Sequence, residues 1–280
     1  MSVSRIKFGS QAYADAINET YDNVLLKGMD IIGRDDFYGI AAWKGLAFFG
    51  KKLKLTRRSH LLDLCSGIGG PARFLADAYG CNVTGIDLSE FNHRAAQKRT
   101  KKAGLDHLVS FRHGDALDLP FEDESFTHVL GCESWCYFPD KVALYRAAKR
   151  VLRPGGIIAF LEAACETPVR LHTEDLLGLV RYESIGRYTE MLKAAGFTNI
   201  RHYDTTNLAS RDVARSLYQL VSNRERVLRL AGGEVYFGLL ELWAEFIAYF
   251  SQGKLTHCGF VAVKPERNRT SIENQRLSRK

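Results

Sequence analysis

Several features that would place a chain in a particular class of protein are missing from this sequence. It contains no internal repeat and no low-complexity segment, and its hydrophobic (46%) and charged (25%) contents are ordinary for a globular protein. These values exclude a disordered chain, a collagen-like repeat and a coiled coil. No apolar run approaches the roughly 18 residues of a membrane-spanning helix. The opening MSVSRIKFGS lacks the apolar core of a secretory signal.

The cysteine pattern excludes two further kinds of site. There are six cysteines, and no two of them form a CxxC pair. In a chain of 280 residues this pattern indicates reduced thiols, not a disulfide framework or a zinc site. We therefore expect a cytoplasmic protein whose own residues form no metal site. The six are Cys65, Cys81, Cys132, Cys136, Cys165 and Cys258.

The net charge of +7 is unevenly distributed along the chain. Residues 264–280 hold six basic and two acidic side chains, so the rest of the sequence carries only +3. Because this end is also poor in apolar residues, we expect 265–280 to be a disordered basic tail. The remaining charge favours a small anionic or hydrophobic acceptor over a nucleic-acid partner.

Short apolar runs alternate with helical patterns in the middle of the sequence. Helices are expected over 70–79, 89–103 and 139–151, and VLRPGG (151–156) predicts a helix end followed by a turn. Strands separated by helices imply parallel crossovers and an α/β fold with helices on both faces of a mostly parallel sheet. The expected strands are 60–65, 81–88, 108–113, 126–132 and 155–163.

The pattern changes after residue 165. A helix is expected over 184–195, and strands over 197–204 and 257–264. The residues between these two strands are helical in pattern, and we expect 205–254 to form a cap over a binding site. Their aromatic stripe is equally compatible with ordinary core packing. It consists of Tyr236, Leu240, Trp243, Ile247 and Phe250.

The chain is accordingly divided into three parts. Residues 1–55 form an aromatic-rich helical accessory region, 56–264 form the sheet domain with its inserted cap, and 265–280 form the tail.

The strongest chemical signal is LLDLCSGIGGPARFL (61–75). A strand ends near Asp63, a glycine-containing turn follows, and a helix begins near Gly70. Gly67 and Gly69 let the backbone approach a ligand where a Cβ atom would collide with it. In open α/β sheets a turn of this kind, at the carboxyl end of a strand, is where ligands bind.

Two more acidic residues follow at informative spacings. Asp87 ends the second strand, where a carboxylate suits the two hydroxyls of a ribose, and Asp115 follows the third. Any one of Asp63, Asp87 and Asp115 would be read as a helix cap or turn former. All three, in this order and followed by VLRPGG, favour a nucleoside-binding site.

These motifs resemble the class I S-adenosylmethionine (SAM)-dependent methyltransferases over about 55–165, and more loosely to 264. The resemblance implies a seven-stranded Rossmann-like sheet and SAM as cofactor. Glycine is usual in that family at the position of Cys65, so the turn departs from the pattern there. The implied cofactor residues are Asp63, Cys65, Gly67, Gly69, Asp87, Leu88, Asp115, Ala116 and Cys132.

A dinucleotide site is the alternative for the same turn. The frame GIGGPA carries alanine at the third glycine position, which that fingerprint also allows. Asp63 favours SAM, whose sulfur is a positively charged sulfonium, because a carboxylate beside the turn attracts a cation and repels a pyrophosphate.

Within the family, GIGGPARFLA, AGLDHLVSFRHGDALDLPF and KRVLRPGG look like the sterol, tocopherol, sarcosine/dimethylglycine and prenyl-diphosphate methyltransferases. Methylases of exocyclic base amines typically carry (D/N)PP(Y/F) after the fourth strand. This chain has CESWCYFPD (132–140) there, which argues against a nucleic-acid substrate.

That segment also supplies the candidate catalytic residues. Glu133 and Ser134 look like the Glu-Ser or Glu-Ala pair of the sterol, tocopherol and prenyl groups. If the acceptor is an alkene, Glu133 would remove a proton from the carbocation, and Trp135 and Tyr137 would stabilise it. If the acceptor is an amine, the aromatic rings would surround an ammonium. The structural alternative is that Glu133 holds loop amides.

Three hypotheses about function remain open. The first is C-methylation of an isoprenoid, with prenyl diphosphates, which would bring Mg²⁺ with them, among the candidate acceptors. The second is N-methylation of a small amine, and the third is a non-catalytic protein that binds the cofactor or a nucleic acid through 51–58 and 94–102. Candidates to hold an anion are Lys44, Arg170, Arg181, Arg187 and Arg211. His128 is expected on the fourth strand, and the histidines that could reach the site are His172, His202 and His257.

Overall fold

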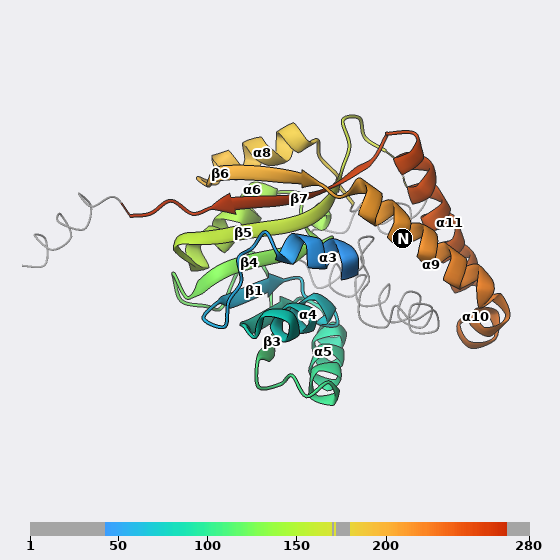
Figure 1. Cartoon of the computed structure of the whole chain (residues 1–280), viewed down its shortest axis with the longest axis horizontal. Helices are drawn as coiled ribbons and strands as arrows, with labels where there is room; N and C mark the ends of the chain where they lie inside the picture. The colour runs from blue at the N-terminus through green and yellow to red at the C-terminus, as the bar shows by residue number, and fades with distance from the viewer. Residues whose placement is uncertain (1–42, 170, 172–179, 268–280) are drawn as a thin grey trace, which may run out of the picture.

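The computed structural model describes residues 43–169, 171 and 180–267. Its centre is a seven-stranded sheet in the order β3-β2-β1-β4-β5-β7-β6 (Figure 1). β7 runs antiparallel to both of its neighbours, and the pairings from β3 to β5 are parallel. The predicted mostly parallel sheet of seven strands is therefore confirmed. The strands are β1 (His60–Leu64), β2 (Asn82–Asp87), β3 (Val109–His113), β4 (Phe126–Cys132), β5 (Leu152–Ala164), β6 (Thr198–Asp204) and β7 (Thr256–Val263).

The helices begin and end at residues that suit those positions. Ser89 caps one helix by accepting a hydrogen bond from the Asn92 amide (3.1 Å), and Asp140 caps another through Ala143 (2.9 Å). The described helices are α3 (Trp43–Gly50), α4 (Gly70–Tyr79), α5 (Glu90–Lys102), the 3-10 turn η3 (Trp135–Tyr137), α6 (Lys141–Val151), α8 (Ile185–Ala194), α9 (Thr206–Ser222), α10 (Arg224–Ala231) and α11 (Gly233–Ser251).

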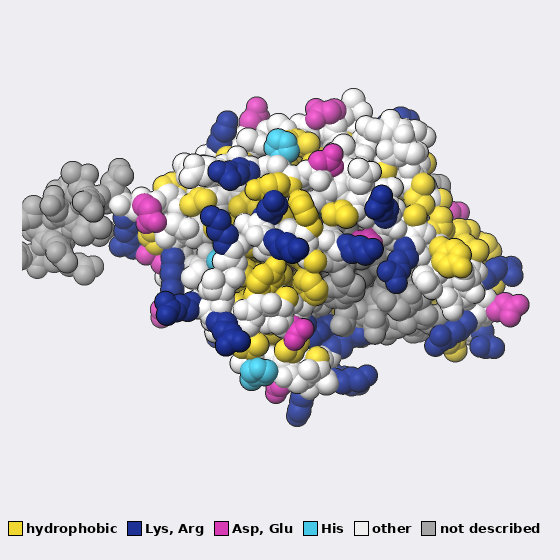
Figure 2. Space-filling model, in the orientation of Figure 1, with side chains coloured by type: hydrophobic (Ala, Val, Ile, Leu, Met, Phe, Trp, Pro, Cys, Tyr) yellow, Lys and Arg dark blue, Asp and Glu magenta, His cyan; other side chains and the backbone are white. Residues whose placement is uncertain are grey.

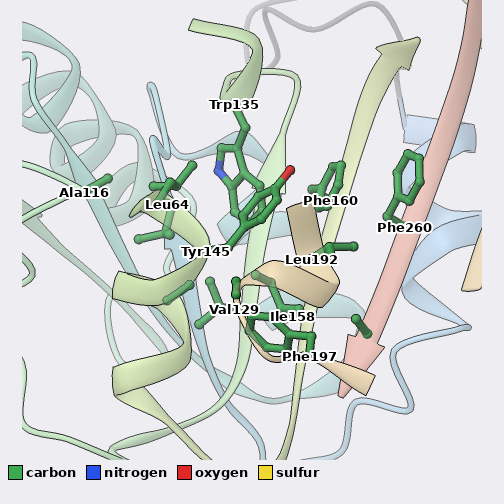
Figure 3. Packing of buried hydrophobic residues seen from close by; sticks show 14 of the residues in the cluster. Leu64, Ala116, Val129, Trp135, Tyr145, Ile158, Phe160, Leu192, Phe197 and Phe260 are labelled. Atoms are coloured by element: carbon green, nitrogen blue, oxygen red, sulfur yellow. The ribbon is translucent and has the colours of Figure 1, made fainter. Parts of the chain in front are cut away.

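Alternate residues of the strands enter two separate hydrophobic clusters, one on each face of the sheet. In β1, Leu62 and Leu64 face the cluster that contains α6 and α8, whereas Leu61 faces the cluster that contains α4 and α3. On the first face the rings of Phe160 and Phe260 stack with their centroids 4.7 Å apart. Figure 3 shows both side chains in this cluster. The helices predicted for both faces are thus in place.

A third cluster joins α9, α10 and α11, which connect β6 to β7 and extend beyond one end of the sheet (Figure 1). Tyr236, Trp243 and Phe250 of the aromatic stripe are buried in it together with Val213 and Leu220 of α9. The stripe therefore packs helix against helix. That 205–254 covers a substrate stays a prediction. The helical pattern of this segment is confirmed, with a break at Asn223 between α9 and α10.

The turn predicted at VLRPGG differs from the structure. The helix ends at Val151 as expected, but β5 begins directly at Leu152, which pairs with Phe126. The register then shifts before Ile157 pairs with His128. The Pro-Gly-Gly sequence is accommodated as an irregularity inside the strand, because the Gly155 amide donates to the Lys264 carbonyl (2.9 Å).

Parts of several predictions lie outside the described residues. These are most of the N-terminal region (1–42), Arg170, His172 and the tail from 268 onward. Among the helices that are described, none combines the length and the apolar character needed to cross a bilayer.

Candidate active site

The carboxyl ends of four strands bring acidic side chains to one edge of the sheet. Asp63 lies on β1 and Asp87 ends β2, while Glu133 follows β4 and Glu162 lies near the end of β5. In the sheet, β2 lies on one side of β1 and β4 lies on its other side, so the strand order reverses direction at β1. The edge beside β1 is therefore the switch point at which open α/β sheets bind ligands.

The turn after β1 is built from residues with left-handed backbone. Cys65 has φ 60°, so this non-glycine residue adopts the conformation that glycine usually supplies. Gly69 has φ 81°, and a Cβ atom there would lie 2.4 Å from Cζ of Phe111. The turn is held by Asp87, whose Oδ2 accepts a hydrogen bond from the Gly67 amide (2.8 Å).

Asp87 makes further bonds through its other oxygen. Oδ1 accepts from the Ser89 amide (2.9 Å) and from Nδ2 of Asn92 (3.3 Å). Burial nevertheless keeps the pKa of Asp87 above its ordinary value, against the lowering effect of these donors. Carboxylate oxygens have about four lone-pair sites between them, so Asp87 can still accept from a ligand hydroxyl.

Asp63 has no such donors. It is fully buried, and among the described residues neither of its oxygens has a hydrogen-bond partner. Burial, and then the nearby charge of Asp87, raise the pKa of Asp63 to about 8. An unpaired buried carboxyl group is costly, which indicates a place where a cationic or hydrogen-donating ligand group belongs. Asp63 and the glycine turn thus fit a cofactor with a positive charge beside a nucleoside.

The three acidic residues predicted to bind the cofactor all lie near Cys65. Asp87, Asp63 and Asp115 all raise the pKa of the Cys65 thiol, in addition to the larger effect of its desolvation. Asp115 also accepts a hydrogen bond from the Leu117 amide (2.8 Å), the turn-forming role that was the alternative for it. Among the other predicted cofactor residues, Leu88 bonds to His113 Nε2 through its carbonyl oxygen (2.8 Å), and Ala116 is buried.

Glu133 lies in a buried hydrogen-bonded chain with one residue of β7 and one residue between β6 and α9. Its Oε1 is 2.9 Å from Nε2 of His257, and Nδ1 of His257 is 2.6 Å from Oγ1 of Thr205. Side-chain exposure is 5% for Glu133 and 0% for His257. Sequence reasoning named His257 without placing it and missed Thr205. The signal that could have found Thr205 is the antiparallel pairing of β6 with β7, which places the end of β6 beside the start of β7.

Trp135 is placed in the core. Its ring packs against Tyr145 and Phe160, with centroids 5.6 and 5.0 Å away (Figure 3). Gly131 makes room for it, because a Cβ there would lie 2.1 Å from the indole. This placement explains Trp135 as a packing residue and lends no support to its predicted contact with a carbocation. Tyr137 is half-buried in η3, and its predicted role stays a prediction.

A second buried polar cluster was not anticipated from the sequence. Glu162 accepts a hydrogen bond from the Cys136 amide at Oε2 (2.9 Å), and burial together with the charge of Glu133 raises its pKa to about 8. Lys141 is also buried, with Nζ donating to the Phe138 carbonyl (3.1 Å), and burial lowers its pKa. Cys132 lies beside this group, because Asp63, Glu133 and Glu162 all raise the pKa of its thiol after desolvation.

The basic residues proposed to hold an anion lie on different elements. Lys44 is on α3, Arg187 is on α8 and Arg211 is on α9, and all three are exposed. Arg187 is paired with Glu190 (3.2 Å), and Arg181, also exposed, precedes α8. On the face shown in Figure 2, Lys and Arg side chains are spread over several elements.

Two of the other histidines named from the sequence lie among the described residues. His128 is buried on β4, where Nε2 bonds to the Leu53 carbonyl (2.9 Å), and His202 is exposed on β6. Over residues 43–169, 171 and 180–267, no three His, Cys, Asp or Glu side chains are grouped as metal ligands.

Comparison with known proteins identifies the family. The family model described as "Methyltransferase domain" matches residues 62–160. A 27-O-demethylrifamycin SV methyltransferase from Amycolatopsis mediterranei (strain S699) is 31% identical over 224 residues, which are 76% of this chain and 80% of that protein. The chain belongs to the class I SAM-dependent methyltransferases.

Other methyltransferases share parts of the chain. A glycine/sarcosine/dimethylglycine N-methyltransferase from Actinopolyspora halophila is 30% identical over 66% of this chain and 33% of its own length. The sterol 24-C-methyltransferase ERG6B from Gibberella zeae is 32% identical over 51% of this chain and 40% of its own length. The chain thus spans less than half of each of these two methyltransferases.

Solved methyltransferase structures share the fold. A phosphoethanolamine N-methyltransferase 2 from Haemonchus contortus superposes with a TM-score of 0.82 at 22% identity, covering 91% of this chain and 60% of that one. A geranyl diphosphate methyltransferase superposes with a TM-score of 0.71 at 18% identity, covering 91% of this chain and all of that one.

Proposed function

We propose that this protein transfers a methyl group from SAM to a small molecule, by C-methylation of an isoprenoid alkene. The single observation that carries the proposal is the buried carboxylate of Glu133 at the end of β4, held by His257. Family membership supports SAM as the cofactor, and so does the Asp63 carboxyl group, which has no hydrogen-bond partner among the described residues. When bound, SAM supplies an electrophilic methyl group on a positively charged sulfur.

The charge distribution favours that cofactor over a dinucleotide. Asp63, Asp87, Glu133 and Glu162 concentrate carboxyl groups at one edge of the sheet. A pyrophosphate would be repelled there, whereas a sulfonium and an ammonium would be attracted. Asp87 would bind the ribose hydroxyls, the glycine turn would lie against the nucleoside, and Asp63 would lie beside positive charge.

Glu133 would remove the proton that completes C-methylation. When the π electrons of an alkene form the new carbon–carbon bond, the neighbouring carbon is left positive. Glu133 would take a proton from an adjacent carbon, and the electrons of that C–H bond would form the new double bond. The partial likeness to a sterol C-methyltransferase supports this class of acceptor.

N-methylation of a small amine is the second candidate function. The observation that favours it is the acidic edge itself, which suits a cationic amine better than a diphosphate. The sarcosine/dimethylglycine relative supports the same class. For this reaction Glu133 would bind the ammonium and accept its proton.

The decisive experiment is an acceptor screen. The protein is incubated with methyl-labelled SAM and a panel of prenyl diphosphates, sterols and small amines, with Mg²⁺ or with EDTA, and the label is located by mass spectrometry. Label on carbon supports C-methylation, and label on nitrogen would contradict it and support N-methylation of a small amine. Tight SAM binding without transfer to any acceptor would favour a non-catalytic binding protein.

The predicted base is tested by Glu133→Gln. The amide keeps the shape of the carboxylate but takes up no proton, so we expect C-methylation to fall about 100-fold or more while SAM affinity, measured by calorimetry, is retained. The matched control is Glu190→Gln, an exposed residue of α8 paired with Arg187. Unchanged turnover in E133Q would remove Glu133 from this role.

A further inference from the structure

The most exposed large hydrophobic side chains of the described residues are concentrated in one part of the molecule. Four of them are more than half exposed, and all four lie in the helices between β6 and β7. A fifth, Phe91 on α5, is less exposed (37%). Single exposed hydrophobic residues are ordinary, but several in one region mark an interaction surface. The four are Tyr218 (69%), Val221 (51%), Leu230 (56%) and Phe237 (53%).

The ends of the helices bring these side chains together. Val221 lies in the last turn of α9, Leu230 in the last turn of α10 and Phe237 in the second turn of α11. Tyr218 is three residues before Val221, which places the two on neighbouring positions of α9. α10 lies at the end of this helical insertion that is farthest from the sheet (Figure 1). The four side chains therefore belong to a projecting end of the molecule.

Core packing does not account for these four residues. Leu220 and Tyr236 are buried in the cluster that joins α9, α10 and α11, and they immediately precede the exposed Val221 and Phe237. Neighbouring residues of a helix point about 100° apart, so each helix buries one hydrophobic side chain and exposes the next. The inner face of the insertion is thus filled by other residues, and the outer face needs its own explanation.

Arginines lie beside the exposed hydrophobic side chains. Residues 206–231 contain five arginines and no lysine, against the exposed Glu225 and the buried Asp212, a net charge of +3. Glu234, at the start of α11, is a further acidic residue at this end. The arginines are all exposed, and none of the salt bridges among the described residues uses them. They are Arg211, Arg215, Arg224, Arg226 and Arg229.

Helical spacing mixes the two kinds of side chain on the same faces. Arg226 is four residues before Leu230 on α10, and Arg215 is three residues before Tyr218 on α9, so each pair lies on one face of its helix. At the end of the molecule where Figure 1 places α10, Figure 2 shows hydrophobic side chains next to those of Lys and Arg. Guanidinium groups bind phosphate through pairs of parallel hydrogen bonds. The surface therefore combines hydrophobic side chains with groups that bind phosphate.

This combination fits a lipid surface better than a second copy of the chain. In a two-fold dimer the same patch meets itself, so the arginines of one copy would face those of the other. An anionic bilayer instead offers phosphate groups to the arginines and a hydrophobic layer just beneath them. Because the helices project beyond the sheet, their end can enter the headgroup layer without the rest of the molecule meeting the bilayer (Figure 1).

We propose that the end of the insertion formed by α9, α10 and the start of α11 docks on the surface of an anionic phospholipid bilayer. Tyr218, Val221, Leu230 and Phe237 enter the headgroup layer, and the arginines of α9 and α10 bind lipid phosphates. The contact lies on the membrane and does not span it. It goes beyond methyl transfer and does not depend on which acceptor receives the methyl group.

Sedimentation with vesicles gives the first test. The full chain is mixed with vesicles of phosphatidylcholine alone, or of phosphatidylcholine with about 30% phosphatidylserine, at low and at physiological salt. We expect binding to the anionic vesicles to be at least about tenfold tighter, and to weaken as salt rises, because the arginines are attracted to negative charge. Equal affinity for both kinds of vesicle, or binding to neither, overturns the proposal.

Paired substitutions identify the surface that binds. Leu230→Ser with Phe237→Ser removes two hydrophobic side chains, and Arg226→Glu with Arg229→Glu reverses two charges. We expect each pair to weaken binding to anionic vesicles about tenfold or more. All four positions are exposed, and thermal melting checks that the variants fold.

The matched controls lie on α5. Phe91→Ser removes the exposed hydrophobic side chain there, and Lys98→Glu with Lys101→Glu reverses two exposed charges. Both controls should bind vesicles as the wild type does. Loss of binding in the controls with retention in the α10 and α11 variants would place the contact on α5 and overturn the proposal.

Two further measurements need no methyl acceptor and no assumption about how the variants fold. Anionic vesicles should slow hydrogen–deuterium exchange of the wild-type protein in α9 and α10 and leave α5 and β1 unchanged; protection confined to other elements contradicts the proposal. Light scattering should give the same mass for the wild type and for L230S/F237S. A wild-type dimer that becomes a monomer in this variant would assign the surface to a second copy of the chain and overturn membrane docking.

Discussion

Asp63 illustrates how one residue can reduce stability at a binding site. Its carboxyl group is buried and, among the described residues, makes no hydrogen bond, and its pKa is raised to about 8. Between pH 4 and 8 the native state therefore keeps a proton that the unfolded chain releases. The free energy of unfolding falls as pH rises through this window, and below it the two states bind the proton equally. A cationic ligand beside Asp63 would offset the cost.

Replacing Asp63 with Asn should flatten this pH dependence. The amide does not ionise, so the fall in the free energy of unfolding between pH 5 and 8 should lessen by about 1.4 kcal/mol per pH unit. Urea denaturation at pH 5, 6.5 and 8 measures it. Affinity for SAM should weaken in the same variant, because Asn, unlike Asp63, cannot ionise when a cationic ligand binds beside it.

Asp77→Asn, on the exposed surface of α4, is the control and should leave the slope unchanged. An equal slope in D63N and the wild type would contradict the assignment of this titration to Asp63. Some pH dependence of the free energy of unfolding should remain in both D63N and the wild type, because the pKa of Glu162 is also raised to about 8.

At the scale of elements, β4 and η3 depend on one close contact. Trp135 folds back over the end of its own strand, and the space for its ring exists only because residue 131 is glycine. The same turn sets Glu133, with φ 53°, at the end of the strand. Packing of the indole against Tyr145 and Phe160 therefore positions the candidate base, which is how a core residue can affect the site without touching a substrate.

A double-mutant cycle tests this coupling. Trp135→Ala should cost about 3–5 kcal/mol of the free energy of unfolding through the cavity it leaves. Gly131→Ala should be destabilising because its Cβ would collide with the indole. In the double variant the collision is absent, so we expect a smaller cost than the sum of the two. Urea unfolding of the four proteins measures the difference, and strictly additive costs would show that the two residues are not in conflict.

At the scale of the whole molecule, three hydrophobic clusters divide the structure. Two cover the faces of the sheet, and the third joins α9, α10 and α11 to the end of β5 and the residues after it. Elements that share a cluster tend to open together. The helices between β6 and β7 should therefore be a separate cooperative unit, attached to the sheet at one end.

Trp243→Ala tests this division. Trp243 is buried in the third cluster, and its loss should cost about 3–5 kcal/mol there. We expect hydrogen–deuterium exchange to accelerate in α9, α10 and α11, while β1 and β4 remain protected and SAM affinity is unchanged. Faster exchange throughout the sheet would indicate one cooperative unit instead. Leu230→Ala, at an exposed position of α10, is the matched control.

Much of the fold and part of the candidate site follow from local sequence patterns. The strand from 126 to 132 and the helix from 70 to 79 were predicted at their observed bounds, because side-chain periodicity acts over a few residues. Asp63, Asp87 and Asp115 were predicted to bind one cofactor, because each lies at or after the end of a strand. All three lie near enough to Cys65 to raise the pKa of its thiol, and their binding of a cofactor stays a prediction.

What the sequence alone could determine was therefore the type of each element, the parallel sheet and the placement of chemistry at its carboxyl edge. Tertiary structure decided the rest. Only packing shows that Trp135 faces the core, that Asp63 is left without a hydrogen-bond partner among the described residues, and that His257 reaches Glu133 across 124 residues. These outcomes depend on contacts between distant segments, and such contacts leave no periodic trace in the chain.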